Sequence, residues 1–253
     1  MQYIVLLQEP SQYFLVRMTE EKKSIFEEGE VLLFDKPLYW TSFDLVNKVR
    51  IMITSSLGIK KIKVGHAGTL DPLATGLMII CTGKATKRIE EFKDLDKEYV
   101  AGFHFGQTTA SFDLETETEG NFPTDHITRE LVEKALEGFR GEQLQMPPMH
   151  SAKFIDGKRA YEYARKGIEK EIKAVSVNFR ELEIVDFGIP VTTIRLLCSK
   201  GTYVRSFARD LGIRLGTGCY LSALERTAIG HFSKKDAFTL EKFDLFLKNM
   251  KQI

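Results

Sequence analysis

Residues 65–76 read GHAGTLDPLATG and present one carboxylate, Asp71, among small residues and directly before Pro72. This content of glycine, threonine and proline is unsuited to a helix or an interior strand and predicts a shaped loop. The apolar residues 77–81 follow at once, so we expect the loop to lead into a buried strand. A lone acid beside a core strand can serve as a nucleophile or a base. An Asp that only hydrogen-bonds its own turn has the same surroundings, so the spacing leaves both interpretations open.

Three basic clusters lie near loop-like stretches of the chain. Basic side chains reach phosphates and aromatic side chains stack on unpaired bases, which is typical of proteins that bind single-stranded RNA loops. One such cluster alone is more typical of a solvated surface, but three of them together with a lone acid favour an RNA partner. The clusters are Lys60, Lys61 and Lys63; Lys84, Lys87 and Arg88; and Lys153, Lys158, Arg159, Arg165 and Lys166, interleaved with Phe154, Tyr161 and Tyr163.

The sequence SKGTYVR (199–205) follows an apolar run and places Tyr203 and Arg205 two residues apart. If strand geometry continues there, both side chains point to the same side. The guanidinium could then pair with a buried carboxylate and hold it ionised. The alternative is a surface arginine at the start of a helix.

Bulk properties exclude several classes of protein. A chain of 253 residues, with 43% hydrophobic and 28% charged residues, is typical of a soluble globular protein with a sizeable core. A net charge of +1 gives no indication about nucleic acid. No apolar run approaches the ~18 residues of a membrane span, and the first residues lack the basic region of a signal peptide. The histidines and cysteines lack metal-ligand spacing, so we expect no metal site and reduced structural thiols.

The elements that must position these residues follow from periodicity and capping signals. Residues 1–28 form an N-terminal extension of uncertain structure, with residues 3–7 a possible strand and 20–28 a charged, solvated stretch. No linker divides the rest, so a single α+β domain is expected over 29–253, with an extended arm at 145–172 that holds a helical turn at 160–166. Strands are expected over 31–34, 77–81, 97–105, 174–187, 191–198 and 221–229. Helices are expected over 43–57 after the cap Thr41-Ser42, from 82–88 through Phe92, over 128–139, within 201–216 after a turn, and over 240–250.

Several motifs together resemble one known family. GHAGTLDPLATG is preceded by GEVLLFDKP and TS, and it is followed by GKATK, KEYV and CSKGTYVR. In this order, over about 29–243, they resemble the bacterial tRNA pseudouridine-55 synthase family, the TruB type. The resemblance implies a pseudouridine synthase fold, with a mixed, mostly antiparallel bent sheet flanked by helices and loops. It also implies that uridine 55 in the T-loop of tRNA is flipped out and isomerised to pseudouridine, without a cofactor.

The resemblance also carries roles onto individual residues. Asp71 becomes the essential catalytic residue, and attack on the sugar, addition to the base and removal of the 2′ proton all remain open for it. The implied substrate-binding residues are Tyr99, packed on the flipped uracil; Arg205, paired with the catalytic acid; Tyr203 and Leu224, in the pocket; and His66, which helps displace the base. Residues 145–172 match a mobile arm that closes over the T-loop. The expected RNA-binding residues are Lys84, Lys87, Lys153, Lys158 and Arg159.

Two departures and two alternatives accompany this hypothesis. The family pattern T-D-T-x-D reads TASFD at 109–113, so its first acid is missing and Asp113 remains. Only about ten residues follow Phe243, so we expect no C-terminal PUA-type domain. The expected partner is the tRNA T-arm, bound by a cytoplasmic monomer. An RNA-binding module or tRNA folding chaperone without turnover is one alternative, and an acid-based hydrolase is another, although no second carboxylate is placed for it.

Overall fold

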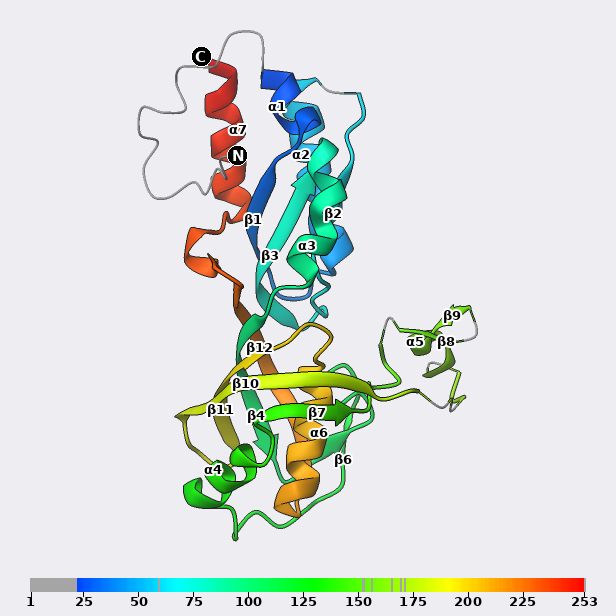
Figure 1. The fold of residues 1–253 in the computed structure, drawn as a ribbon, viewed down its shortest axis with the longest axis vertical. Helices are drawn as coiled ribbons and strands as arrows, with labels where there is room; N and C mark the ends of the chain where they lie inside the picture. The colour runs from blue at the N-terminus through cyan, green and yellow to red at the C-terminus, as the bar shows by residue number, and fades with distance from the viewer. Residues whose placement is uncertain are drawn as a thin grey trace. The chain divides into compact units, whose positions relative to one another are not determined.

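The computed structural model describes residues 22–58, 60–151, 153–155, 157–164, 166–168, 170 and 172–252, with the backbone alone at 22–24, 154, 155, 159, 161, 164, 251 and 252. The chain divides into two compact units, residues 1–95 with 225–253, and residues 96–224. Each unit is described by itself below (Figure 1). The single domain expected over 29–253 therefore stays a prediction, and the possible strand at 3–7 lies outside the described residues.

The first unit is built around the antiparallel pair of strands β1 and β3. Val31 lies opposite Cys81 and Lys36 lies opposite Gly76, and β2 also pairs with β3. Gly76 has φ +103°, and a Cβ atom there would meet the Arg226 carbonyl oxygen at 2.3 Å, so only glycine fits this position. The elements are α1 (Lys22–Glu28), β1 (Val31–Lys36), α2 (Ser42–Leu57), β2 (Val64–His66), β3 (Ala74–Thr82), η2 (Gly83–Arg88), α3 (Ile89–Lys93), β13 (Phe232–Ser233), η3 (Lys234–Asp236) and α7 (Leu240–Gln252).

Helix α2 begins and ends at the signals that the sequence predicts. Thr41 accepts a hydrogen bond from the Asp44 backbone N–H, and the Asp44 carboxylate accepts one from the Thr41 N–H, which completes a capping box. Gly58 ends the helix with φ +63°, a left-handed conformation that favours glycine. The side of the helix that faces the core carries Leu45, Val49 and Ile53, which are fully buried.

Aromatic rings fill the core between α1, β1 and α7. Phe34 of β1 lies edge-on to Phe243 of α7 at 4.9 Å, and Phe26 of α1 meets the same ring at 6.5 Å. Phe26 is 1% exposed, so the prediction of a solvated stretch at 20–28 is wrong for its apolar face. The charged residues around Phe26 made this core position hard to predict from the sequence. The buried Phe26 ring packs the helix against the core.

The second unit is an antiparallel sheet in which the order of strands is β12, β4, β11, β10, β7. Strand β12 (Cys219–Ile229) crosses the boundary between the units. Strand β4 occupies the predicted residues, whereas β7, in the sequence GEQLQ, was not predicted. The elements are β4 (Lys97–Phe105), β5 (Thr108–Thr109), β6 (Thr118–Glu119), α4 (Arg129–Glu137), β7 (Gly141–Gln145), β8 (Phe154–Ile155), β9 (Lys158–Arg159), α5 (Ala160–Ala164), β10 (Val175–Asp186), β11 (Val191–Cys198) and α6 (Val204–Leu215).

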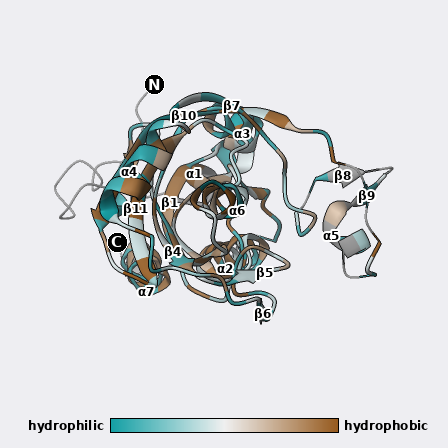
Figure 2. Cartoon of the chain, turned by 90° about the horizontal axis from the view of Figure 1, so that it is seen from below, coloured by the Kyte–Doolittle hydropathy of each residue, from teal (hydrophilic) through white to brown (hydrophobic). Residues whose placement is uncertain are grey.

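Helix α6 lies against this sheet (Figure 1), and Phe207 is on its buried side. The Phe207 ring lies 5.5 Å from Phe103 of β4, and 5.0 Å from both Phe139 and Phe179. Figure 2 shows hydrophilic and hydrophobic residues interspersed along β10 and α4, as expected for elements with one buried face. The strands and helices confirm the predicted α+β class with a mixed sheet of mostly antiparallel strands.

Three expectations need correction, and two are confirmed. Gly65 and His66 belong to β2, and residues 74–76 belong to β3, so only the centre of the 65–76 segment is a loop. The strand before SKGTYVR ends at Cys198, and Tyr203 is the N-cap of α6, so strand geometry does not continue to Arg205. The helix start proposed as the alternative is correct, but Arg205 is 4% exposed and is not a surface residue. The expected turn at 160–166 is the helix α5.

Over the part of the chain that is described, no helix has the length and apolar character needed to cross a membrane.

Candidate active site

The Asp71 loop is held by backbone hydrogen bonds on both sides of its carboxylate. The Ala74 N–H donates to the Asp71 carbonyl at 3.0 Å, and the Tyr39 N–H donates to the Pro72 carbonyl at 2.8 Å. Buried Ser42, in the first turn of α2, donates its hydroxyl to the Leu70 carbonyl and accepts the Leu70 N–H, at 2.9 and 2.8 Å. The helix start and the FDKP strand end thus fix the backbone that presents Asp71.

Lys36 supports this loop from within the core. Its side chain is fully buried, and the ammonium donates to the carbonyls of Trp40 at 2.6 Å, Pro37 at 3.0 Å and Pro72 at 3.4 Å. Burial lowers the Lys36 pKa to about 8, and the negative charge of Asp71 acts against that shift. The same attraction between Lys36 and Asp71 favours the ionised form of the carboxylate.

Arg226 supplies a second buried cation on the same unit. It is 1% exposed, and its Nε donates to the Leu77 carbonyl at 2.7 Å while Nη2 donates to the Gly68 carbonyl at 3.2 Å. These two acceptors flank Asp71 in the sequence. Sequence reasoning missed Arg226, and the only available signal is a charged residue within the predicted strand 221–229.

His66 lies in β2, at the start of the same motif. Burial lowers its pKa, and the positive charge of Arg226 adds to this effect. The imidazole is thus neutral near pH 7. A neutral, partly buried ring suits contact with a nucleobase better than contact with a phosphate.

Arg205 is fixed in the second unit by an acid that the sequence left without a role. Its Nε lies 3.5 Å from the Asp113 carboxylate, and both side chains are 5% exposed. Its Nη1 lies 3.5 Å from the Ser111 carbonyl. Asp113 is itself oriented by the Glu115 N–H, which donates to Oδ1 at 3.0 Å. The surviving acid of the TASFD pattern therefore orients Arg205.

The remaining predicted substrate-binding residues also lie in the second unit. Tyr99 is in β4, 9% exposed and opposite Leu196 of β11. Tyr203 is half-buried at the N-cap of α6, and Leu224 is half-buried in β12. His66 and Asp71 thus belong to one unit, whereas Tyr99, Tyr203, Arg205 and Leu224 belong to the other. The joining of the two sets into one pocket stays a prediction.

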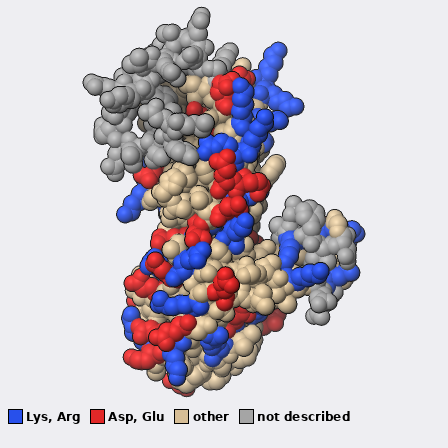
Figure 3. All heavy atoms as spheres, viewed as in Figure 1, with Lys and Arg blue, Asp and Glu red and all other residues tan. Residues whose placement is uncertain are grey.

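The predicted RNA-binding residues differ in their surroundings. Lys84 forms an exposed ion pair with Glu28 at 2.7 Å. Lys87 and Lys158 are also exposed. Lys153 donates to the Lys173 carbonyl at 2.8 Å. Figure 3 shows basic and acidic atoms interspersed over the body of the second unit and basic atoms on its arm. Arg159 lies in β9, and its side chain is outside the described residues.

Metal and thiol chemistry have no support in the described residues. Within them, no group of three or more His, Cys, Asp or Glu side chains is placed to hold a metal ion. Cys81, Cys198 and Cys219 are free and buried, which confirms the structural thiols that were predicted. Burial raises the pKa of the Cys81 and Cys198 thiols to about 12, so both stay protonated.

Comparison with known proteins places these motifs in a family. Residues 55–204 match the family described as TruB family pseudouridylate synthase (N terminal domain). The chain is 57% identical over 222 residues to the tRNA pseudouridine synthase B of Phocaeicola vulgatus, covering 88% of this chain and 94% of the relative. It is 47% identical over 228 residues to the protein of the same name from Flavobacterium johnsoniae, covering 90% and 98%.

A solved structure shares the fold at lower identity. A chain of an H/ACA RNP bound to a substrate RNA containing 2′-deoxyuridine aligns with a TM-score of 0.65 and 22% identity. The match covers 91% of this chain and 56% of that chain, so the chain spans a little over half of that neighbour's length. At this identity the likeness concerns the fold alone. The motif around Asp71, the match over residues 55–204 and the full-length relatives lead to the same assignment: the chain belongs to the TruB family of pseudouridylate synthases.

Proposed function

We propose that this chain isomerises uridine 55 in the T-loop of tRNA to pseudouridine, with Asp71 as the essential catalytic carboxylate. The observation that carries the proposal is the Asp71 loop, whose backbone is held by the buried cations Lys36 and Arg226. The curated relatives, named tRNA pseudouridine synthase B, support tRNA as the substrate. The position of the uridine within tRNA and the role of Asp71 belong to the proposal.

The isomerisation leaves the composition of the uridine unchanged. The C1′–N1 bond breaks, the uracil turns, and a C1′–C5 bond forms. C5 loses its proton, and N1 gains one. Attack of Asp71 on the sugar, addition to the base and removal of the 2′ proton all require an unprotonated carboxylate, which neighbouring positive charge favours. Lys36 lies close enough to supply such charge.

The uracil is free of the sugar during this reaction and must stay in a closed pocket. In the proposed complex, Tyr99 packs on the flipped base, and Tyr203 and Leu224 line the pocket. Arg205 pairs with Asp71, and His66 helps displace the base from the stack. Extrusion of a loop base costs a few kcal/mol, which contacts elsewhere on the RNA must offset.

Contacts to the T-arm are assigned to the basic residues and to the arm at 145–172. Lys84, Lys87, Lys153, Lys158 and Arg159 reach phosphates, and the enzyme acts as a cytoplasmic monomer without a cofactor. Exposed Lys87 and Lys158 support this assignment most directly, because an exposed ammonium contacts a phosphate without breaking another bond.

Tritium release tests the proposal. tRNA transcribed with [5-³H]uridine should release one tritium per molecule in the presence of the protein, because only C5 of the target loses its proton. A matched transcript with cytidine at position 55 should release none. Equal release from both transcripts would contradict the assignment to position 55. Tight T-arm binding without release would instead favour an RNA-binding module.

A further inference from the structure

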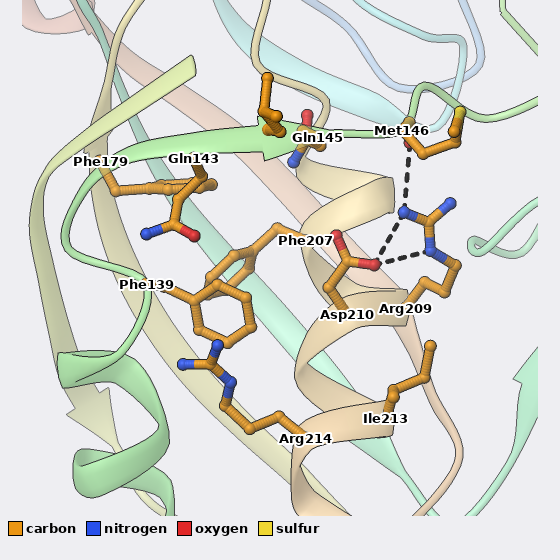
Figure 4. A pocket seen from close by; sticks show the side chains of 11 residues that line it. Phe139, Gln143, Gln145, Met146, Phe179, Phe207, Arg209, Asp210, Ile213 and Arg214 are labelled. Carbon is orange, nitrogen blue, oxygen red and sulfur yellow. Dashed lines mark hydrogen bonds and ion pairs between the residues drawn. The ribbon is translucent and has the colours of Figure 1, made fainter. Parts of the chain in front are cut away.

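Gln145, the last residue of β7, makes two hydrogen bonds to the backbone of Tyr203. Its Oε1 accepts the Tyr203 N–H at 2.8 Å, and its Nε2 donates to the Tyr203 carbonyl at 3.1 Å. The Gln145 side chain is 3% exposed and Tyr203 is half-buried, so the two bonds are partly shielded from water. It borders a cavity of about 470 Å³ between β7 and α6 (Figure 4). The neutral amide therefore satisfies both the N–H and the carbonyl of Tyr203, as the backbone of a neighbouring strand would.

The next residue strengthens the same connection. The Met146 carbonyl accepts the Ser206 hydroxyl at 2.8 Å and the Arg209 Nη2 at 3.2 Å, the latter bond drawn in Figure 4. Residues 145 and 146 therefore hold the first two turns of α6 through four hydrogen bonds. Both residues also begin the 145–172 arm.

Tyr203 depends on this external support because its own side chain makes no capping hydrogen bond to α6. A helix start without a side-chain cap leaves its position to contacts from other elements. Arg205 lies two residues further on, in the first turn, with only 4% of its surface exposed. A shift of the Tyr203 backbone would therefore move Arg205 as well.

We propose that Gln145 is a positioning residue for the isomerisation, acting through the Tyr203 backbone to place Tyr203 and Arg205 against the flipped uridine. The inference rests on the proposed function and goes beyond it, since Gln145 itself touches no reacting atom. Its two bonds also connect the first residue of the 145–172 arm to the helix that carries Arg205. A displacement of the start of the arm would therefore displace this part of the proposed pocket as well.

The variant Gln145→Met tests this role, because methionine has a similar volume but makes neither bond. The single-turnover rate constant at saturating enzyme should fall about 10- to 100-fold, since a displacement of about 1 Å costs that much. The dissociation constant for tRNA should stay within about twofold. A rate constant under saturation does not depend on the folded fraction, so a purely structural role would leave it unchanged.

Gln143→Met is the matched control. Gln143 lies two residues earlier on the same face of β7 and borders the same cavity. Among the described residues its side chain has no hydrogen-bond partner. The single-turnover rate constant of Gln143→Met should equal that of the wild type.

Gln145→Glu provides a second, independent readout. The introduced carboxyl, once protonated, can accept the Tyr203 N–H and donate to the Tyr203 carbonyl, as the amide does. When ionised, it has no donor and repels that carbonyl. The single-turnover rate constant of Gln145→Glu relative to wild type should therefore rise as the pH falls. The midpoint should lie above the usual carboxyl range, because burial raises the pKa of the introduced carboxyl. The charged groups that line the same cavity are Arg209, Asp210 and Arg214 of α6.

The outcomes separate this inference from the proposed function. Wild-type turnover together with an unchanged rate constant in Gln145→Met would overturn the inference and leave the function standing. A flat pH dependence of the Gln145→Glu to wild-type ratio would overturn it too. A wild-type protein that releases no tritium from tRNA would overturn both.

Discussion

In the first unit the Asp71 loop is held through carbonyl oxygens that accept from two buried cations, Lys36 and Arg226. In the second unit Arg205 is held by the carboxylate of Asp113, and the backbone beside it by the neutral amide of Gln145. The first arrangement places positive charge around an acid that the proposed reaction requires in its ionised form. The second fixes the direction of one guanidinium.

This difference has an energetic consequence. A buried cation bonded only to carbonyls leaves those carbonyls without donors once it is removed, and each one costs about 1–3 kcal/mol. Removal of the Asp113 charge instead leaves most of the local backbone bonds in place. We therefore expect removal of either buried cation, Lys36 or Arg226, to act mainly on folding, and changes around Arg205 to act mainly on rate.

Arg226→Met should have the largest effect on stability. The buried Leu77 carbonyl and the half-buried Gly68 carbonyl lose their donors, so the free energy of unfolding should fall by about 4 kcal/mol. Urea denaturation followed by circular dichroism measures this. The control Arg88→Met removes a half-exposed arginine paired with Glu91 and should cost less than about 1 kcal/mol. Equal losses would contradict the distinction between buried and surface cations.

The Lys36 pKa of about 8 predicts a pH dependence of stability. Between pH 8 and pH 10.5 the unfolded state holds the lysine proton and the folded state does not, so this group makes stability rise with pH. The free energy of unfolding of wild type, relative to Lys36→Met, should increase by up to about 3 kcal/mol over this window. Denaturation at several pH values measures it, and a constant difference would refute the assignment.

Asp113→Asn should slow the reaction while keeping the fold. Asparagine retains an acceptor for the Glu115 N–H but loses the charge opposite Arg205. The single-turnover rate constant should fall about 10- to 100-fold, equivalent to about 2 kcal/mol, with the melting temperature nearly unchanged. Asp96→Asn removes an acid that is paired with Arg180 and 36% exposed, and it should leave the rate unaffected.

The smallest effects are expected for the surface lysines. Lys158→Ala removes an exposed ammonium on the arm and should weaken tRNA binding about two- to threefold, with a shallower salt dependence. Lys84→Ala should do less, because Glu28 already neutralises that charge at 2.7 Å. Filter binding over a range of salt concentrations measures both. A larger loss in Lys84→Ala would reverse the order of the two sites.

Local signals in the sequence predicted several elements correctly. Helix α2 follows from Thr41 and Gly58, because a capping box and a left-handed glycine act within a few residues. Strand β4 follows from its alternating pattern. Strand β7 was missed, because GEQLQ is mostly polar and is held in the sheet by β10, about 30 residues further along the chain.

Long-range partners account for the rest of what sequence reasoning could not supply. The motif match named Asp71, yet nothing near it in the chain indicates Arg226, which lies 155 residues away. The sequence left two hypotheses for Arg205, continued strand geometry and a helix start, and only the end of β11 at Cys198 decides for the helix. Asp113 was noticed only as the remainder of a pattern. Its contact with Arg205 depends on a fold that brings residues 92 positions apart together.

The central claim is that the ionised carboxylate of Asp71 performs the isomerisation, and Asp71→Asn tests it most directly. The asparagine side chain is nearly isosteric with that of aspartate, so tRNA should bind with a dissociation constant within about twofold of wild type. Tritium release from [5-³H]uridine-labelled tRNA under single-turnover conditions should fall by at least about 1000-fold. Release at the wild-type rate in this variant would contradict the account.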